Sequence, residues 1–245
     1  MTTTQTEHTT PQNGDLRSGI IRRMVQVLIQ VLIQALVPFL AAGTLRWWEA
    51  WAYIGIYLVG GIAINSFFML RLNPEVIAER GRAAQATNWK AWDKIVGIVA
   101  AVFYLIGILL VAGLDKRFGW TGPIPLLVQI VAFVLYALGS GLFSWAMISN
   151  AYFSTAVRIQ EERGHAVCSS GPYRFVRHPG YVGVMLQSLV APLMFGSLWA
   201  LLPGVLAVLS LAIRTALEDR MLQDELGGYR DYAQRVRYRL LPGVW

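Results

Sequence analysis

Six apolar stretches alternate with short polar segments along the chain, and their lengths predict membrane-spanning helices. A helix needs roughly 20 mainly apolar residues to cross the hydrocarbon core of a bilayer. The stretches fall at about residues 24–43, 51–70, 95–114, 124–148, 180–195 and 198–217. The fifth is short, and Gly196-Ser197 separates it from the sixth, which predicts a tight helical hairpin whose arms need not span fully. The pattern is typical of an all-α integral membrane protein with about six transmembrane helices.

Lysine and arginine are concentrated in alternate connections, which predicts the orientation of the helices. Cytoplasmic loops of membrane proteins carry an excess of these residues. They precede the first stretch, separate the second from the third and the fourth from the fifth, and recur after the sixth. The opposite connections hold only Arg46, Lys116 and Arg117. Both termini are therefore expected in the cytoplasm, and short loops without an organellar targeting signal favour a bacterial inner membrane.

The composition supports membrane insertion and narrows the classes of partner. Of the 245 residues, 56% are hydrophobic and 14% are charged, whereas about 25% are charged in a typical soluble domain. The net charge of +7 is distributed between apolar stretches rather than along one stripe. It therefore indicates anionic membrane lipids as partners and not nucleic acid. Cys168 is the single cysteine, which excludes an intrachain disulfide and a Cys-x-x-Cys zinc site, so no metal centre is predicted.

The polarity of the chain divides it into three segments. Residues 1–18 are polar and rich in threonine, which predicts a disordered N-terminal tail. Residues 19–148 hold the first four predicted transmembrane helices, and the first is too long for the apolar region of a signal peptide. Residues 149–245 are expected to form a C-terminal core, with an interfacial helix, an Arg-His-Pro motif, the helical hairpin, and a cytoplasmic helix and tail.

Two polar segments on the cytoplasmic side are predicted to form short helices. In RLNPEVIAERGR (residues 71–82), Pro74 begins a helix and Glu75 lies near its N-terminus, where the helix dipole stabilises an acid. We expect a solvated helix at the interface there. In STAVRIQEERG (residues 154–164) the pattern is amphipathic, which predicts a helix that Gly164 ends.

A third polar segment, GPYRFVRHPGYVG (residues 171–183), is predicted to bind an anion. Gly171-Pro172 indicates a turn, and Pro179 fits the first turn of the fifth predicted helix. Arg177 and His178 then lie beside the N–H groups of a helix N-terminus, which bind carboxylates and phosphates. An isolated Arg-His-Pro would only anchor a helix end at the headgroups. The surrounding tyrosines and glycines, and acids later in the chain, favour a binding site instead.

The acids after the sixth apolar stretch extend this hypothesis. Arg214, Glu218, Leu222 and Glu225 are spaced to lie on one face of a continuous helix. Because the fifth and sixth helices run in opposite directions, the hairpin returns Glu218 to the level at which His178 begins the fifth. The alternative is a local ion pair between Arg214 and Glu218, which contributes little if it is exposed.

Three motifs together resemble those of a known membrane enzyme family. They are N-x-x-FS-x-x-VRIQ-x-x-RGH from Asn150, GPYRFVRHPGYVG from Gly171, and LEDRMLQDELGGYRDYAQRVRYRLLP from Leu217. In this order, they resemble the isoprenylcysteine carboxyl methyltransferase family, which includes phospholipid N-methyltransferases. The resemblance covers roughly the last hundred residues, and LNPEVIAERGR more loosely.

The resemblance implies an S-adenosylmethionine-dependent methyltransferase whose cofactor pocket lies on the cytoplasmic side. In the family, the Arg-His-Pro segment and an acidic pair after the last helix build that pocket. Asp219 departs from the second glutamate that many members carry. The implied cofactor-binding residues are Arg177, His178, Pro179, Tyr181, Gly183, Glu218 and Asp219.

The chemistry of the cofactor is compatible with these residues. Glu218 can complement its sulfonium or ammonium group, and Arg177 and His178 suit its carboxylate. Stacking on adenine, or an approach to the sulfonium, is expected of Tyr173, Tyr181 or Tyr229. The candidates for catalysis are Glu218, together with Arg174 or Arg214, which can orient an anionic acceptor.

The predicted acceptor is a lipophilic or prenylated molecule that reaches the site through the membrane. The carboxyl group of an isoprenylcysteine-like compound is favoured, with phospholipid amines and small hydrophobic compounds as alternatives. A carboxylate needs no general base, whereas an amine must lose a proton. GYRDYAQRVRYRLLP is also similar to the end of sterol reductases, so an NADPH-dependent membrane reductase is a second hypothesis. A transporter or scaffold is disfavoured, because the charges gather at one interface.

Overall fold

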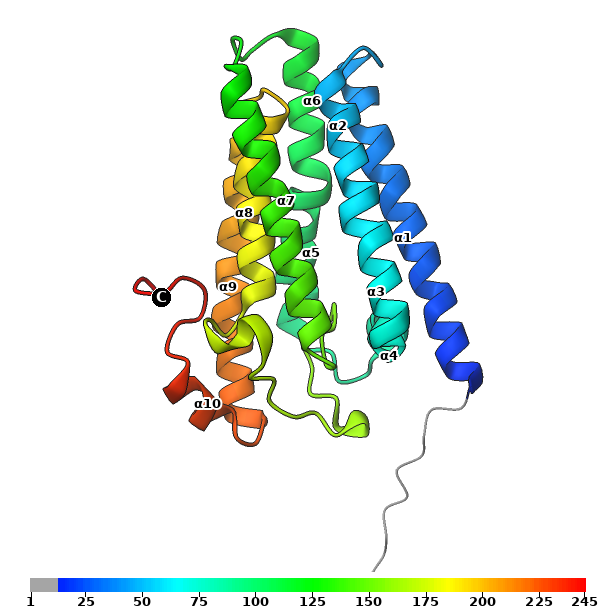
Figure 1. The fold of residues 1–245 in the computed structure, drawn as a ribbon, viewed down its shortest axis with the longest axis vertical. Helices are drawn as coiled ribbons and strands as arrows, with labels where there is room; N and C mark the ends of the chain where they lie inside the picture. Colours follow the sequence, from blue (N-terminus) through cyan, green and yellow to red (C-terminus); the bar gives the residue numbers. More distant parts are fainter. Residues whose placement is uncertain (1–12) are drawn as a thin grey trace, which may run out of the picture.

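The computed structural model describes residues 13–245, and in that part of the chain it contains helices and no strand. Six apolar segments run along a common axis (Figure 1). They are α1 (Asn13–Ala42); α2 (Trp48–Ile56) continued by η1 (Tyr57–Ile64) and α3 (Asn65–Leu72); α5 (Ala91–Val102) continued by η3 (Phe103–Gly107) and α6 (Ile108–Phe118); α7 (Leu126–Ser149); α8 (Pro179–Met194); and α9 (Leu201–Glu225).

These helices confirm the prediction of an all-α integral membrane protein. Five segments are long and apolar enough to cross a membrane, and α8 is a shorter apolar helix of 16 residues. The fifth predicted helix is therefore short, as its sequence indicates. The sixth, α9, continues to Glu225, beyond the end of its apolar stretch.

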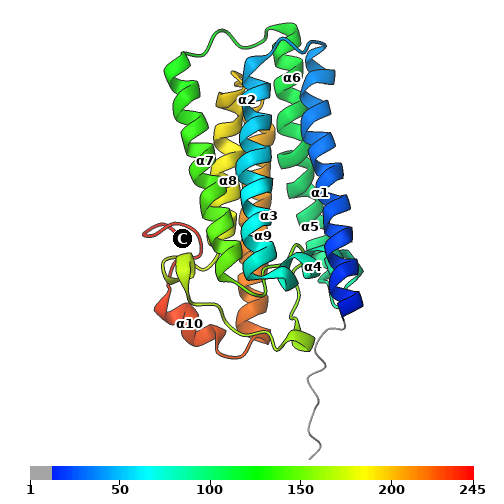
Figure 2. The same cartoon turned by 45° about the vertical axis from the view of Figure 1, so that its right-hand side comes forward.

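The polar segments gather at one end of the bundle, which we call the polar end. It holds α4 (Pro74–Arg82), the segment from Asn150 to His178, and α10 (Tyr229–Arg235) (Figures 1 and 2). In the described part of the chain, the opposite end holds the short connections after α1, α6 and α8. Most of the polar segments, and all of the motifs that the sequence singled out, therefore lie at the polar end.

The hairpin of α8 and α9 depends on one glycine at its turn and on small residues along its sides. Gly196 has φ +71, a conformation that side chains disfavour. Gly183 faces α7, where a Cβ would stand 2.6 Å from the carbonyl oxygen of Gly139. Gly183 was expected to bind the cofactor, and the structure instead places it in a helix–helix contact, because only glycine permits this separation.

The disordered tail predicted for residues 1–18 extends too far along the chain, because α1 begins at Asn13. Residues 13–18 form the first turns of α1, and residues 1–12 lie outside the described residues. This start of α1 is held by α4, since Arg82 donates to the carbonyl oxygen of Asp15 at 2.9 Å and Gly19 lies against Ala78. The same contacts bury one face of α4, so α4 is not the solvated helix that its sequence suggested.

The predicted interfacial helix at residues 154–164 is also absent. The segment is irregular except for η4 (Glu161–Arg163), and Gly164 follows with φ +61. Its backbone groups bond to distant residues: the Val157 N–H donates to Asp93 Oδ2 at 2.8 Å, and the Thr155 carbonyl accepts from Arg214 Nη2 at 2.8 Å. These tertiary contacts satisfy the backbone in place of helical hydrogen bonds.

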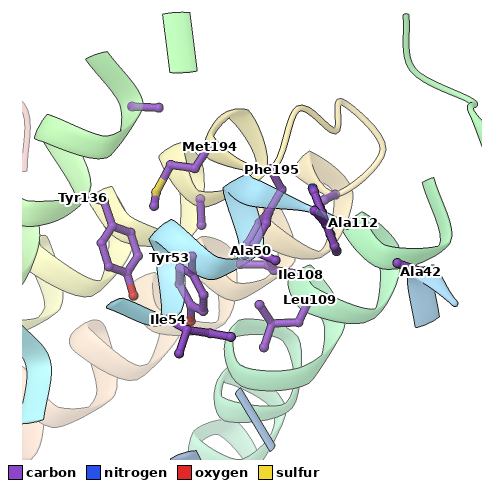
Figure 3. Packing of buried hydrophobic residues seen from close by; sticks show 14 of the residues in the cluster. Ala42, Ala50, Tyr53, Ile54, Ile108, Leu109, Ala112, Tyr136, Met194 and Phe195 are labelled. Carbon is purple, nitrogen blue, oxygen red and sulfur yellow. The ribbon is translucent and has the colours of Figure 1, made fainter. Parts of the chain in front are cut away.

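A cluster of large apolar side chains joins the helices on the side of the bundle away from the polar end. Figure 3 shows Tyr53, Ile54, Ile108, Leu109 and Tyr136 pointing toward one another from three of the segments. Met194 and Phe195, at the end of α8, complete the contact. The cluster fixes the helices there, and the cavities of the protein lie nearer the polar end.

Candidate functional site

A cavity at the polar end collects most of the residues that the sequence predicted for a cofactor. It lies among the segment from Asn150 to Cys168, the start of α8, the end of α9 and α10. Its empty space, with the open mouth, is about 830 Å³. We call it the Glu218 cavity. The predicted residues that line it are Tyr173, Arg177, His178, Tyr181, Glu218 and Tyr229.

Glu218 is the acid that faces this cavity. Tyr181, one turn into α8, donates a hydrogen bond to Glu218 Oε2 at 2.5 Å. Within residues 13–245, no basic side chain lies within ion-pair distance of the Glu218 carboxylate. Arg214 pairs instead with the fully buried Asp93, at 2.6 Å, so the local Arg214–Glu218 ion pair does not form. A half-buried carboxylate without a cation favours a positively charged ligand.

Asp219, the next residue, has the opposite surroundings. Its carboxylate is completely buried and accepts from Arg177 Nε at 2.6 Å, Arg239 Nε at 2.9 Å and Tyr229 Oη at 3.0 Å. Neighbouring residues of a helix point about 100° apart, so Asp219 faces the tail while Glu218 faces the cavity. Asp219 is not among the residues that line the cavity, so its contact with the cofactor stays a prediction, and its bonds in the structure hold Arg177, Tyr229 and Arg239 together.

Arg177 joins the start of α8 to the C-terminal tail. Its guanidinium donates to Asp219 and, at 2.8 Å each, to the carbonyl oxygens of Val236 and Arg237. Its backbone N–H donates to the Tyr238 carbonyl at 3.0 Å. Most of its donors are therefore already used, although Arg177 does line the cavity. Pro179 begins α8 as predicted but does not line the cavity.

His178 presents a ring nitrogen near the same network. Its Nε2 is buried and lies 3.4 Å from Asp219 Oδ1. The imidazole stacks on the Tyr181 ring, with centroids 5.7 Å apart and planes 3° from parallel. His178 therefore lines the cavity while this nitrogen faces the buried Asp219.

Residues 150–165, which are irregular except for η4 and which we call the irregular segment, contribute a wall of the cavity to which the sequence assigned no role. The segment supplies Asn150, Tyr152, Phe153, Arg158, Gln160 and His165. His165 stacks on Tyr152 at 4.5 Å, and burial, followed by the charge of Arg163, lowers the pKa of His165 to about 4. His165 is therefore neutral at pH 7. The sequence did contain a signal for this wall, because Arg158, Gln160 and His165 belong to the first of the three motifs that carry the family resemblance.

A buried ion pair holds this wall in place. Arg158 Nη2 lies 2.7 Å from Glu79 on α4, and both side chains are almost fully buried. The same nitrogen lies 2.6 Å from the exposed Glu162, and hydrogen bonding by Arg158 lowers the pKa of the Glu162 carboxyl. Since a buried charge is costly without its partner, Glu79 and Arg158 position the segment.

Neither arginine that was predicted to orient an acceptor lines the Glu218 cavity. Arg174 is exposed, because the short helix η5 (Gly171–Arg174) turns it toward the Phe175 ring, 5.9 Å away, and solvent. Arg214 lies one turn before Glu218, over the Tyr181 ring at 5.4 Å, and is neutralised by Asp93. The positive charge of Arg214 therefore balances a buried acid.

Tyr173 and Tyr232 form the apolar floor of the cavity. The Tyr232 hydroxyl donates to the Tyr173 carbonyl at 2.8 Å, and Asn150 Nδ2 donates to the Tyr173 hydroxyl at 3.3 Å. Burial raises the pKa of Tyr173, so this hydroxyl stays protonated. Aromatic faces are thus available for a planar or cationic group.

The part of the chain that builds most of this cavity is similar to a known protein family. Residues 126–224 match the model of the isoprenylcysteine carboxyl methyltransferase family. The chain is also 30% identical over 82 residues to the uncharacterized protein YpbQ of Bacillus subtilis (strain 168). That match covers 33% of this chain and 48% of the relative, so the chain spans about half the length of the curated relative that it matches. The matched family range includes α7, α8 and α9 but not α1–α6 or α10.

Proposed function

We propose that this integral membrane protein, whose residues 126–224 match the isoprenylcysteine carboxyl methyltransferase family, methylates a lipophilic acceptor with S-adenosylmethionine. The favoured acceptor is the carboxylate of an isoprenylcysteine-like compound. The observation that carries the proposal is the Glu218 carboxylate, which faces the cavity without a cationic partner among the described residues.

The lining of the cavity supports this cofactor. S-adenosylmethionine carries two cationic groups, a sulfonium and an ammonium, and Glu218 can complement one of them. His165 adds no opposing charge, because its pKa of about 4 keeps it neutral at pH 7. The rings of Tyr152 and Tyr173, which line the cavity, suit the aromatic part of the cofactor.

When bound, S-adenosylmethionine supplies an electrophilic methyl group. The residues of this chain contribute position and exclusion of water. Tyr181 orients the Glu218 carboxylate, and Arg177 with Asp219 holds the tail against the start of α8. Met221, Leu222 and Leu226 give the cavity an apolar side. Because alignment supplies much of the acceleration of such a displacement, and a carboxylate acceptor has no proton to lose, no general base is needed.

We also propose that the polar end faces the cytoplasm of a bacterial inner membrane, with both termini on that side. The distribution of lysine and arginine along the sequence supports this orientation. The Glu218 cavity is then accessible to a water-soluble cofactor, while a lipophilic acceptor reaches it from the bilayer.

Calorimetry on the detergent-purified chain tests the proposal. We expect S-adenosylmethionine to bind, and Glu218→Ala to weaken binding roughly 10- to 100-fold, because a charged hydrogen-bonding partner is lost. Glu225→Gln is the matched control, since Glu225 is an exposed acid of the same helix that pairs with Lys90. Equal affinity in the wild type and Glu218→Ala would contradict the site.

NADPH in a parallel thermal-shift assay tests the alternative membrane reductase. Its phosphates are negative, so the charge of Glu218 disfavours it in this cavity. We expect stabilisation by S-adenosylmethionine and none by NADPH, and the reverse result would replace methyl transfer with reduction. Mass spectrometry of membrane extracts supplied with methyl-labelled S-adenosylmethionine then identifies the acceptor, including the alternative phospholipid amines.

A further inference from the structure

A second cavity lies inside the helical bundle and contains none of the residues that the sequence proposed for a site. Its walls come from α1, η1, α3, α4, α7 and α8, with Tyr104 from η3, so most of it is outside the range that matches the family. The empty space, with its opening, is about 970 Å³. We call it the Arg80 cavity. Its polar lining includes Arg23, Asn65, Arg80, Tyr104 and Ser140, and its apolar lining includes Ile62, Met69, Ile77, Phe143 and Val184.

Two arginines in this cavity have no acid beside them. Within residues 13–245, no carboxylate lies within ion-pair distance of Arg80 or Arg23. Arg23 donates only a long hydrogen bond, of 3.3 Å, to Gln26 in the next turn of its own helix. Burial, followed by the charges of Arg23 and Arg214, lowers the pKa of the Arg80 guanidinium. Since arginine stays protonated, this cationic pair favours an anion in the cavity.

Asn65 is a second unsatisfied group at the same place. Its side chain is 8% exposed, lines the cavity, and has an Oδ1 atom without a hydrogen-bond partner in the described part of the chain. An acceptor buried in this way costs free energy until a donor reaches it. The cavity therefore offers two cationic donors and one acceptor among apolar side chains, which is suited to an amphiphile with an acidic head.

Arg80 also lies at the partition between the two cavities. Its Cζ atom is 5.4 Å from the centre of the Phe153 ring and 6.0 Å from the centre of the Phe143 ring. Phe153 lines the Glu218 cavity, Phe143 lines the Arg80 cavity, and the two rings meet edge to face at 5.4 Å. At this point, therefore, the contact between the Phe143 and Phe153 side chains separates the two cavities. Phe153 belongs to the irregular segment.

We infer that the Arg80 cavity binds the methyl acceptor, an amphiphile whose carboxylate lies at Arg80 and Arg23 and whose apolar chain extends along Met69, Ile77 and Val184. The inference rests on the proposed function. The acceptor must then carry an anionic group, because two uncompensated arginines favour a carboxylate over an amine. It also assigns acceptor binding to the N-terminal helices, with Arg80 next to the wall of the cofactor cavity.

Binding of a farnesylated thiol acid to the purified chain tests this inference. We expect Arg80→Gln to weaken binding of the acid roughly 10- to 100-fold, because a charged hydrogen bond is lost. Binding of the corresponding methyl ester should change less than about threefold, because the ester has no charge for Arg80 to neutralise. Arg71→Gln is the matched control, since Arg71 is an exposed arginine in the last turn of α3, just before the helix α4 that carries Arg80.

Two further measurements separate the possible outcomes. Affinity for S-adenosylmethionine should be unchanged in Arg80→Gln, which shows that the variant is folded, and Arg23→Gln should reproduce the selective loss. If the cofactor binds but the acid binds equally to wild type and Arg80→Gln, the acceptor site is wrong and the proposed function stands. If Arg80→Gln instead loses co-purified anionic phospholipid, with its affinity for the acid intact, the cavity is a lipid site. No binding of the cofactor to wild type would overturn the proposed function itself.

Discussion

The Glu218 cavity and the Arg80 cavity carry uncompensated charges of opposite sign. Among the described residues, the carboxylate in the Glu218 cavity is hydrogen-bonded to the Tyr181 hydroxyl and pairs with no cation, whereas the two arginines in the Arg80 cavity pair with no acid. Three other buried acids are paired: Asp219 with Arg177 and Arg239, Asp93 with Arg214, and Glu79 with Arg158. These pairs hold elements together. Glu49 and Asp115 are also buried without an ion pair in the described residues, but neither lines either cavity, whereas Glu218, Arg80 and Arg23 do. The contrast fits a cationic cofactor on one side of a partition and an anionic acceptor on the other.

The largest expected effect separates the two neighbouring acids of α9. Asp219→Asn should lower the free energy of unfolding by about 3–5 kcal/mol, because Arg177 and Arg239 lose the charge that neutralises them. Glu218→Gln should change it by less than about 0.5 kcal/mol, since Glu218 balances no cation. Thermal unfolding in detergent, with tryptic cleavage of the tail after Arg235 as a second readout, measures both.

Asp224→Asn is the control for this comparison, because Asp224 forms an exposed pair with Arg230, and such pairs contribute about 1 kcal/mol or less. Equal loss of stability in the Asp219 and Glu218 variants would remove the distinction between a positioning acid and a ligand-binding acid.

A smaller effect is expected at the contact that sets the position of α8. Gly183→Ala places a Cβ 2.6 Å from the Gly139 carbonyl oxygen, so α7 and α8 must separate. Overpacking of this kind costs about 1–3 kcal/mol. Gly141→Ala is matched to it, because no atom lies within 4 Å of the added Cβ there. We expect Gly183→Ala to lower the melting temperature and Gly141→Ala not to lower it. Equal melting temperatures for the two variants would show that α7 and α8 do not pack as described.

The smallest expected effect is the pH dependence of the irregular segment. Burial first, and then the charge of Arg163, lowers the pKa of His165 from 6.5 to about 4. The unfolded chain therefore binds more protons between these values, so the stabilisation is complete above about pH 6.5 and is lost as the pH falls toward 4. His165→Asn should reduce the fall in melting temperature between pH 7 and pH 5 by about 2–4 °C. An unchanged fall would show that His165 is not held in its neutral form.

Much of the fold was predictable because it depends on local properties of the chain. The lengths of the apolar stretches determine the helices, and Gly196-Ser197 determines the turn between α8 and α9. The segment at residues 154–164 was predicted as a helix because its pattern is amphipathic. Bonds to Asp93 and Arg214, which are about 60 residues away in opposite directions, override that preference.

The sequence by itself determined that this is a helical membrane protein with its polar chemistry at one end, because length, apolarity and charge act within a few turns of helix. It also located the family motifs and the Arg-His-Pro start of α8. Only the tertiary structure decided that Glu218 faces a cavity while Asp219 is neutralised, and that Arg214 pairs with Asp93 across 121 residues. It also decided that Arg80 and Arg23 pair with no acid among residues 13–245. The physical reason is that the effect of a charge depends on which distant side chains surround it, and folding brings those side chains together.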